Sequence, residues 1–108
     1  MYTYTMPTGD ETENTIEITE KTSEGFFLNA SCCSSRLNLG MFSGYFKYTS
    51  SDIAEYTGEN YDGNRYKITA QLKENKLHIQ VTSEEEIAED RLLEFGMNVR
   101  MSGIYELK

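Results

Sequence analysis

The sequence predicts a mainly all-β protein, a small antiparallel β-barrel or sandwich of about seven or eight strands, with one short helix near residues 84–93. Thr, Ser, Tyr and Gly are abundant, and the chain has one proline and no tryptophan, which favours strands and turns over helices. Short segments that alternate apolar and polar residues recur along the chain. The length of 108 residues suits one domain with one modest core.

The alternation predicts four strands in the first part of the chain, at 15–20, 25–31, 37–49 and 52–58. Segment 37–49 fits one bent strand or two short ones, because Gly40 and Gly44 permit a bulge or a sharp bend. The polar and acidic opening predicts a flexible N-terminal segment over residues 1–14, followed by a single domain over 15–108.

The clearest unit is "RYKITAQLKENKLHIQVT", which predicts a hairpin over 65–82 with its loop at 73–75 and Asn75 suited to a left-handed position. Ser83 and Glu86 have the spacing of a capping box, which predicts the helix over 84–93, with a charged loop as the alternative. Residues 96–108 are predicted to form the last strand. Large apolar side chains are predicted to fill the interior, namely Phe26, Leu28, Phe46, Ile68, Leu72, Ile79 and Val81.

The net charge of −8 is unevenly distributed. Residues 10–24 and 84–94 each carry six acidic residues against one basic residue, whereas 25–83 is close to neutral. Nucleic-acid binding needs clustered Lys and Arg, so we expect no nucleic-acid partner. The acidic runs favour a solvated surface that aids solubility, with a basic protein partner as the alternative.

The sequence contains no run of about eighteen apolar residues, so no transmembrane segment is predicted. It also lacks the basic and apolar regions of a signal peptide. Two alternatives follow: a cytoplasmic protein, or an extracytoplasmic one whose export signal is not part of this sequence.

Cys32 and Cys33 are the only cysteines. Neighbouring side chains on a strand point to opposite faces, so we expect two free thiols that point apart. An exposed thiol could still cross-link two chains on oxidation. Zinc needs four ligands and the chain has one histidine, His78, which is predicted to face solvent or a groove. We therefore expect no catalytic residue, metal or cofactor.

The segment "ENYDGNRY" places Asn60, Asp62 and Asn64 around Gly63, a spacing similar to that of calcium loops. The segment lacks a bidentate glutamate at the right distance downstream. A turn leading into the strand at 65 is the simpler interpretation.

Tyrosine is the most informative residue type for binding, because it gives contact area at a low cost in entropy. Tyr45 and Tyr61 are predicted to be exposed. The sequence nevertheless favours a structural role, in which several tyrosines cap the core with their hydroxyl groups in water, over a recognition surface.

The order of glycines, aromatic residues and one hairpin over residues 16–108 resembles that of a known family. Gly44 precedes Phe46, Ala54 precedes Tyr56, the hairpin 66–81 follows, and "FG" at 95–96 comes before Gly103 and Tyr105. This order resembles a small β-barrel module of bacterial secreted proteins and lipoproteins, similar to modules that accompany lysozyme-inhibitor-type segments. The resemblance implies a barrel fold and transfers no catalytic residue.

These observations predict a non-enzymatic, extracytoplasmic binding or inhibitor module that recognises a protein partner, for which a basic protein is one candidate. The alternatives are a small-ligand carrier that uses the barrel interior, and a cytoplasmic acidic inhibitor or immunity-type protein. The predicted partner-binding residues are Glu84, Glu85, Glu86, Glu89, Asp90, Tyr45 and Tyr61.

Overall fold

The computed structural model describes residues 2–9, 12–34 and 38–108, and these form a closed antiparallel barrel in which each strand neighbours the next along the chain. The elements are β1 (Tyr2–Gly9), β2 (Thr12–Thr19), β3 (Gly25–Cys33), β4 (Leu39–Tyr48), β5 (Ile53–Glu59), β6 (Arg65–Lys73), β7 (Lys76–Ser83), α1 (Glu89–Leu92) and β8 (Gly103–Leu107). The predicted all-β class, the barrel, the number of strands and the presence of one short helix are confirmed.

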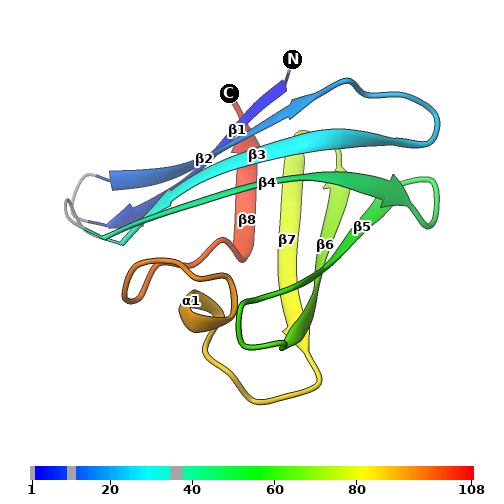
Figure 1. Cartoon of the computed structure of the whole chain (residues 1–108). Coiled ribbons are helices and arrows are strands. Elements are labelled where there is room, and N and C mark those ends of the chain that lie inside the picture. The colour runs from blue at the N-terminus through cyan, green and yellow to red at the C-terminus, as the bar shows by residue number, and fades with distance from the viewer. Residues whose placement is uncertain (1, 10–11, 35–37) are drawn as a thin grey trace.

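The barrel consists of two half-sheets, β1–β4 and β5–β8, which cross each other in Figure 1. Within each half-sheet the ladders are long: β3 and β4 pair from Gly25↔Lys47 to Cys33↔Leu39. The two junctions are short, because β4 pairs with β5 at two positions and β1 pairs with β8 at two positions. We call these junctions the β4–β5 seam and the β8–β1 seam.

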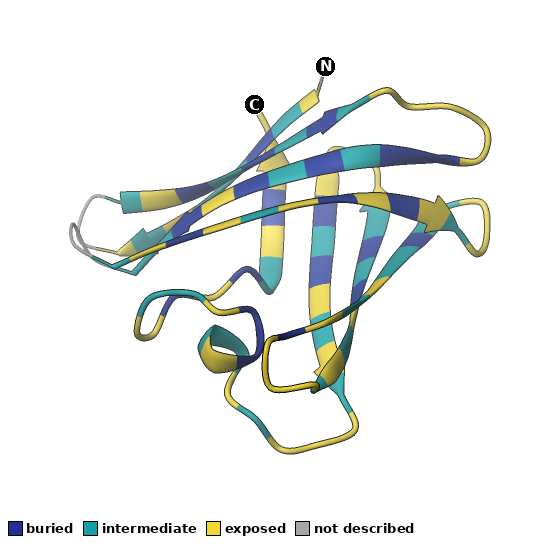
Figure 2. Ribbon diagram, viewed as in Figure 1, coloured by how far each residue is buried: buried dark blue, intermediate teal, exposed yellow. Residues whose placement is uncertain are grey.

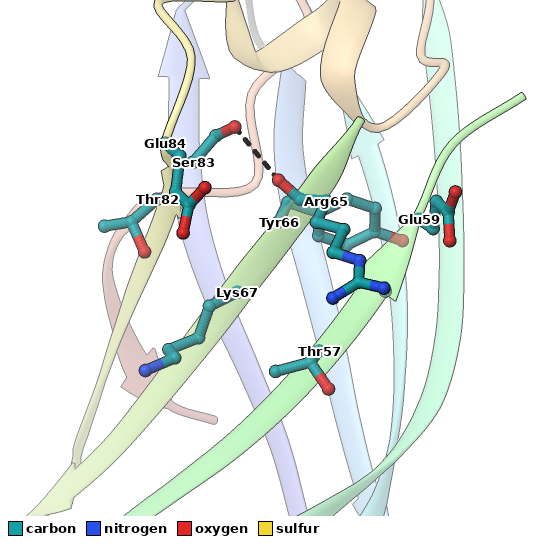
Figure 3. A pocket seen from close by; sticks show the side chains of 9 residues that line it. Thr57, Glu59, Arg65, Tyr66, Lys67, Thr82, Ser83 and Glu84 are labelled. Atoms are coloured by element: carbon teal, nitrogen blue, oxygen red, sulfur yellow. Dashed lines mark hydrogen bonds between the residues drawn. The ribbon is translucent and has the colours of Figure 1, made fainter. Parts of the chain in front are cut away.

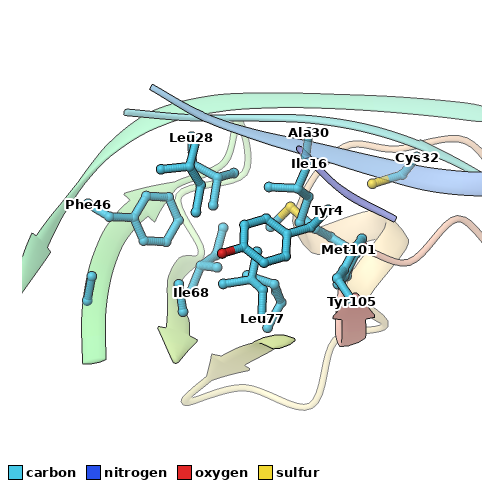
Figure 4. Close-up of a cluster of buried hydrophobic side chains, with 14 of the residues drawn as sticks. Tyr4, Ile16, Leu28, Ala30, Cys32, Phe46, Ile68, Leu77, Met101 and Tyr105 are labelled. Carbon is cyan, nitrogen blue, oxygen red and sulfur yellow. The ribbon is translucent and has the colours of Figure 1, made fainter. Parts of the chain in front are cut away.

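Side chains fill the interior between the half-sheets. Burial alternates along most strands, as the two-residue period of a strand requires (Figure 2). Figure 4 shows the packed centre, to which both half-sheets contribute. Of the residues predicted to fill the interior, five are buried and Leu72 and Val81 pack against them half-buried; the five are Phe26, Leu28, Phe46, Ile68 and Ile79.

The predicted flexible N-terminal segment is wrong for the residues that the structure describes. β1 pairs with β2 from Tyr2↔Ile18 to Gly9↔Thr12 and with β8 at Tyr4↔Leu107. The side chain of Tyr4 is buried in the core. The strand could not be recognised from the sequence because alternating Thr and Tyr residues have a weak apolar pattern. β1 therefore belongs to the barrel domain, which begins before residue 15 and not at it.

The second half of the chain differs from the prediction in three local features. The helix is confined to α1, because Ser83 ends β7 and its hydroxyl donates to the carbonyl of Arg65 (3.0 Å) instead of forming a capping box. The last strand begins only at Gly103, after an irregular segment over 93–102. In the β6–β7 turn the left-handed residue is Glu74 (φ 58°), not Asn75.

No helix in the described part of the chain is long and apolar enough to cross a membrane.

Candidate functional site

A groove of about 710 Å³ lies on the outer wall of β5, β6 and β7 (Figure 3). Apart from Gly58, every residue at its wall is charged or carries a hydroxyl group. The lining residues are Thr57, Gly58, Glu59, Arg65, Tyr66, Lys67, Thr82, Ser83 and Glu84.

Strand register places these side chains in two rows. Lys67 pairs with Thr57 on one side and with Thr82 on the other, so two hydroxyl groups flank one ammonium group. Arg65 pairs with Glu59, and Glu84 follows the last residue of β7 at the same end of the groove. A ligand in this groove would therefore meet a Thr–Lys–Thr row beside a row that combines Arg65 with acidic residues.

The cations of the groove are only lightly neutralised. The Nζ of Lys67 lies 3.7 Å from a carboxylate oxygen of Glu55, and both side chains are substantially exposed. Such an exposed pair contributes little to stability. Within the described ranges this is the only ion pair, so Arg65 keeps its guanidinium free for a ligand.

The acidic segment Glu84–Glu86 leaves the wall of the groove and is exposed. The amide of Glu85 donates to the hydroxyl of Ser83 (3.3 Å), which shapes the turn after β7. These three carboxylates therefore face solvent beside the groove.

The structure uses Glu89 and Asp90 differently from the other predicted partner-binding acids. One carboxylate oxygen of Glu89 accepts hydrogen bonds from the amides of Met101 (2.6 Å) and Ser102 (2.9 Å). The carboxylate of Asp90 accepts hydrogen bonds from the backbone amides of Asn98 (2.6 Å) and Arg91 (2.8 Å). Both half-buried acids thus hold the irregular segment before β8.

Tyr45 and Tyr61 are exposed, as predicted, but they lie on different parts of the barrel. Tyr61 is 96% exposed and follows Asn60, whose side-chain oxygen accepts hydrogen bonds from the amides of Asp62 (3.0 Å) and Asn64 (2.9 Å). This segment is therefore a turn, as the simpler interpretation predicted, and it lies between β5 and β6 at the same end of the barrel as Glu84. Tyr45 is 38% exposed on the outer face of β4, away from that end.

The two cysteines point to opposite faces of β3, as predicted, and both are free. Burial raises the pKa of the Cys32 thiol to about 12. A neutral thiol is a poor nucleophile, so Cys32 is a core residue. Cys33 is half-buried, and its thiol donates to the carbonyl of Glu13 (3.3 Å). Asp10 and Glu11 of the first acidic run lie outside the described residues.

His78 is half-buried on the outer face of β7, where it lines a second hollow of about 320 Å³ with residues of β6 and β8. Its location matches the prediction of solvent or a groove. In the part of the chain that is described, no three His, Cys, Asp or Glu side chains gather closely enough to hold a metal ion.

Comparison with known proteins gives no further guidance, because no family model matches the chain and no significant match is found among curated proteins or solved structures.

Sequence reasoning missed the groove residues Thr57, Glu59, Arg65, Lys67 and Thr82. Their outward positions follow from strand alternation, and the hairpin register of β6 and β7 would have placed Lys67 beside Thr82. No sequence signal marks the hollow itself, because alternation shows which side chains face outward and not the shape of the surface that they form.

Proposed function

We propose that this protein is a non-enzymatic binding module that recognises a basic protein partner through Glu84–Glu86, with Tyr61 at the same end of the barrel. The observation that carries this proposal is the position of Glu84. It belongs to the wall of the groove and also begins a run of three exposed carboxylates. Basic side chains of a partner would be attracted to these carboxylates, and such complementarity raises association rate and selectivity.

The filled interior favours surface recognition over transport of a small ligand. An eight-stranded barrel is either filled by its own side chains or holds one small ligand. Here aromatic rings and aliphatic side chains from both half-sheets occupy the centre (Figure 4). The carrier alternative therefore has less support than a surface site.

The extracytoplasmic location, and membership of the bacterial β-barrel module that the sequence resembles, belong to the same proposal. The cytoplasmic inhibitor alternative shares the binding surface and differs only in location. Detection of the protein in fractionated cells of its source separates the two.

The binding surface is tested with lysozyme as a basic probe protein, by titration at about 50 mM and 300 mM salt. We expect Glu84→Gln, Glu85→Gln and Glu86→Gln together to weaken binding about tenfold or more at low salt. Higher salt should weaken binding by the unchanged protein, because screening shortens the range of the attraction.

The matched control removes three exposed carboxylates at the opposite end of the barrel, with Glu24→Gln, Glu74→Gln and Glu106→Gln. Both triple variants change the net charge equally. Equal binding by the two variants would show that net charge alone attracts the probe, and would remove the support for a specific site at Glu84–Glu86.

A further inference from the structure

Strand β4 is paired along its whole length on one side only. Its ladder with β3 extends from Leu39 to Lys47, whereas its ladder with β5 consists of Lys47↔Glu55 and Tyr48↔Ala54. No strand pairing continues that second ladder toward Leu39 in the described chain. In Figure 1 β5 turns away from β4 after this point.

The backbone groups on the unpaired side belong to alternate residues. The amide of Tyr48 donates to the carbonyl of Glu24 (3.0 Å), so even-numbered residues direct their backbone groups toward β3. The carbonyl of Leu39 accepts from the amide of Gly96 (2.9 Å), on the opposite side. Met41, Ser43 and Tyr45 therefore direct their amides and carbonyls toward the seam, between a contact at Leu39 and the pairing at Lys47.

The outer side of this edge is apolar and accessible. Met41 is 80% exposed and Tyr45 is 38% exposed, with the exposed hydroxyl of Ser43 between them. An exposed edge with apolar side chains is a template for pairing with another chain, and proteins usually cover or charge such edges.

The inner side of the seam is already occupied by aromatic rings. Phe42 and Tyr56 meet edge to face, with their ring centroids 5.0 Å apart. The ring of Tyr56 lies so close to Gly44 that a Cβ there would approach it to 2.7 Å. A strand added at this edge must therefore carry small side chains on its inner face.

We propose that the edge Met41–Tyr45 accepts an extended segment of a basic partner protein by strand addition. The segment would be about five residues long, with backbone hydrogen bonds to Met41, Ser43 and Tyr45. Small residues would face Phe42 and Tyr56, and outward residues would lie beside the exposed side chains of Met41 and Tyr45.

Charge argues for a basic partner rather than a second copy of this chain. Each copy carries a net charge of −8, so pairing of two β4 edges would bring two acidic molecules together. A segment with lysines at its ends would instead be attracted. This edge is separate from Glu84–Glu86, so the inference stands independently of that binding surface.

The first test is amide hydrogen exchange by NMR on the full chain. We expect the amides of Met41, Ser43 and Tyr45 to exchange at least about tenfold faster than those of Phe42 and Gly44, which face β3. Equal protection of both sets in the free protein at low concentration would overturn the proposal, because the edge would not be open. Protection that rises with protein concentration would show pairing of two copies, and would also overturn it.

The second test adds the peptide acetyl-Lys-Ala-Val-Ala-Lys-amide at increasing concentration. If the peptide adds antiparallel to β4, its valine lies opposite Ser43, and the N–H and C=O groups of the valine point toward β4. We expect exchange at Met41, Ser43 and Tyr45 to slow about tenfold at saturation. The same peptide methylated on the valine nitrogen lacks one donor and should give no slowing, and equal effects of the two peptides would overturn the proposal.

A variant pair completes the test. Ser43→Pro removes the amide that faces the seam while leaving the ladder to β3 intact, and Ser43→Ala keeps that amide. We expect the proline variant to lose peptide binding and the alanine variant to retain it. Glu84→Gln, Glu85→Gln and Glu86→Gln together should lower peptide binding only as much as Glu24→Gln, Glu74→Gln and Glu106→Gln together, because both sets change the net charge equally. Failure at this edge and failure of the acidic surface therefore give different results.

Discussion

The two seams that join the half-sheets are equally short in backbone pairing, yet they are closed by different chemistry. At the β4–β5 seam the rings of Phe42, Phe46 and Tyr56 pack against one another, with centroids between 5.0 and 6.2 Å apart. At the β8–β1 seam a buried polar group, Asn14 of β2, donates to the hydroxyl of Tyr105 on β8 (3.0 Å). The same amide group donates to the carbonyl of Arg100 (2.6 Å).

The two seams hold the half-sheets together by different means. Burial of apolar rings requires no specific hydrogen-bonding partner, so the β4–β5 seam keeps its core closed although its backbone ladder ends early. Buried hydrogen bonds require specific partners, so the β8–β1 seam fixes the irregular segment that precedes β8. The hydroxyl of Tyr105 also donates to the carbonyl of Met101 (2.7 Å), which continues that network.

The largest expected effect comes from removing a ring at the aromatic seam. Phe46 is fully buried and stacks on Phe26 at 5.8 Å. We expect Phe46→Ala to lower the free energy of unfolding by about 3–5 kcal/mol, measured by urea unfolding. Tyr45→Ala is the control on the outer face and should change it by less than about 1 kcal/mol. Equal effects of both would show that the rings do not close this seam.

The next effect tests the polar seam. The side-chain oxygen of Asn14 accepts a hydrogen bond from the amide of Cys33 (2.9 Å). Asn14→Ala would therefore leave this amide and the carbonyl of Arg100 without hydrogen-bond partners. We expect a loss of about 2–3 kcal/mol in urea unfolding, because buried unpaired groups are expensive. Asn29→Ala removes an exposed hydrogen bond with Ser43 and should lose less than about 1 kcal/mol. A similar loss for both variants would contradict the role assigned to the network.

A smaller effect sharpens the account of the aromatic seam. In Gly44→Ala the new methyl group would lie 2.7 Å from the ring of Tyr56, so we expect a loss of about 1–3 kcal/mol. In a Tyr56→Leu background the same change should lose at least about 1 kcal/mol less, as measured by a double-mutant cycle. Additive losses would mean that Gly44 is not constrained by this ring.

The smallest effect is a pH dependence at the polar seam. Burial raises the pKa of Cys32 from its ordinary value of 9.0 to about 12. A raised pKa of an acidic group means that the folded state holds the proton more tightly than the unfolded state does. Stability is therefore full below pH 9, falls by on the order of 1 kcal/mol by pH 10, and continues to fall until pH 12.

Urea unfolding of the unchanged protein and of Cys32→Ala, each at pH 8 and pH 10, measures this contribution. The variant should lose less stability between the two pH values than the unchanged protein does. Burial also raises the pKa of Tyr105, so part of the alkaline loss should remain in the variant. An identical pH dependence in both proteins would rule out Cys32 as its source.

The sequence predicted those parts of the fold that depend on local pattern. The hairpin 65–82 alternates cleanly, so β6 and β7 and the buried positions of Ile68 and Ile79 could be predicted from it. The opposite directions of Cys32 and Cys33 followed from strand geometry alone. The exposure of Tyr61 followed from its place in a polar turn.

The candidate sites were only partly predictable. Sequence marked Glu84–Glu86 as exposed acids, but it placed Glu89 and Asp90 with them, although these two hold the backbone of 98–102. Whether a carboxylate faces solvent or a backbone amide depends on where an irregular segment folds back. Periodicity carries no information about that choice.

Composition and alternation by themselves determined that this chain is a small antiparallel β protein with a filled core. Only the tertiary structure decided that Tyr2–Gly9 would close the barrel as β1, that Lys67 would lie between two threonines in a groove, and that β4 would keep an unpaired edge. The physical reason is that alternation specifies which face of a strand is buried. Register, twist and the closure of distant strands depend instead on the packing of side chains that lie far apart in the sequence.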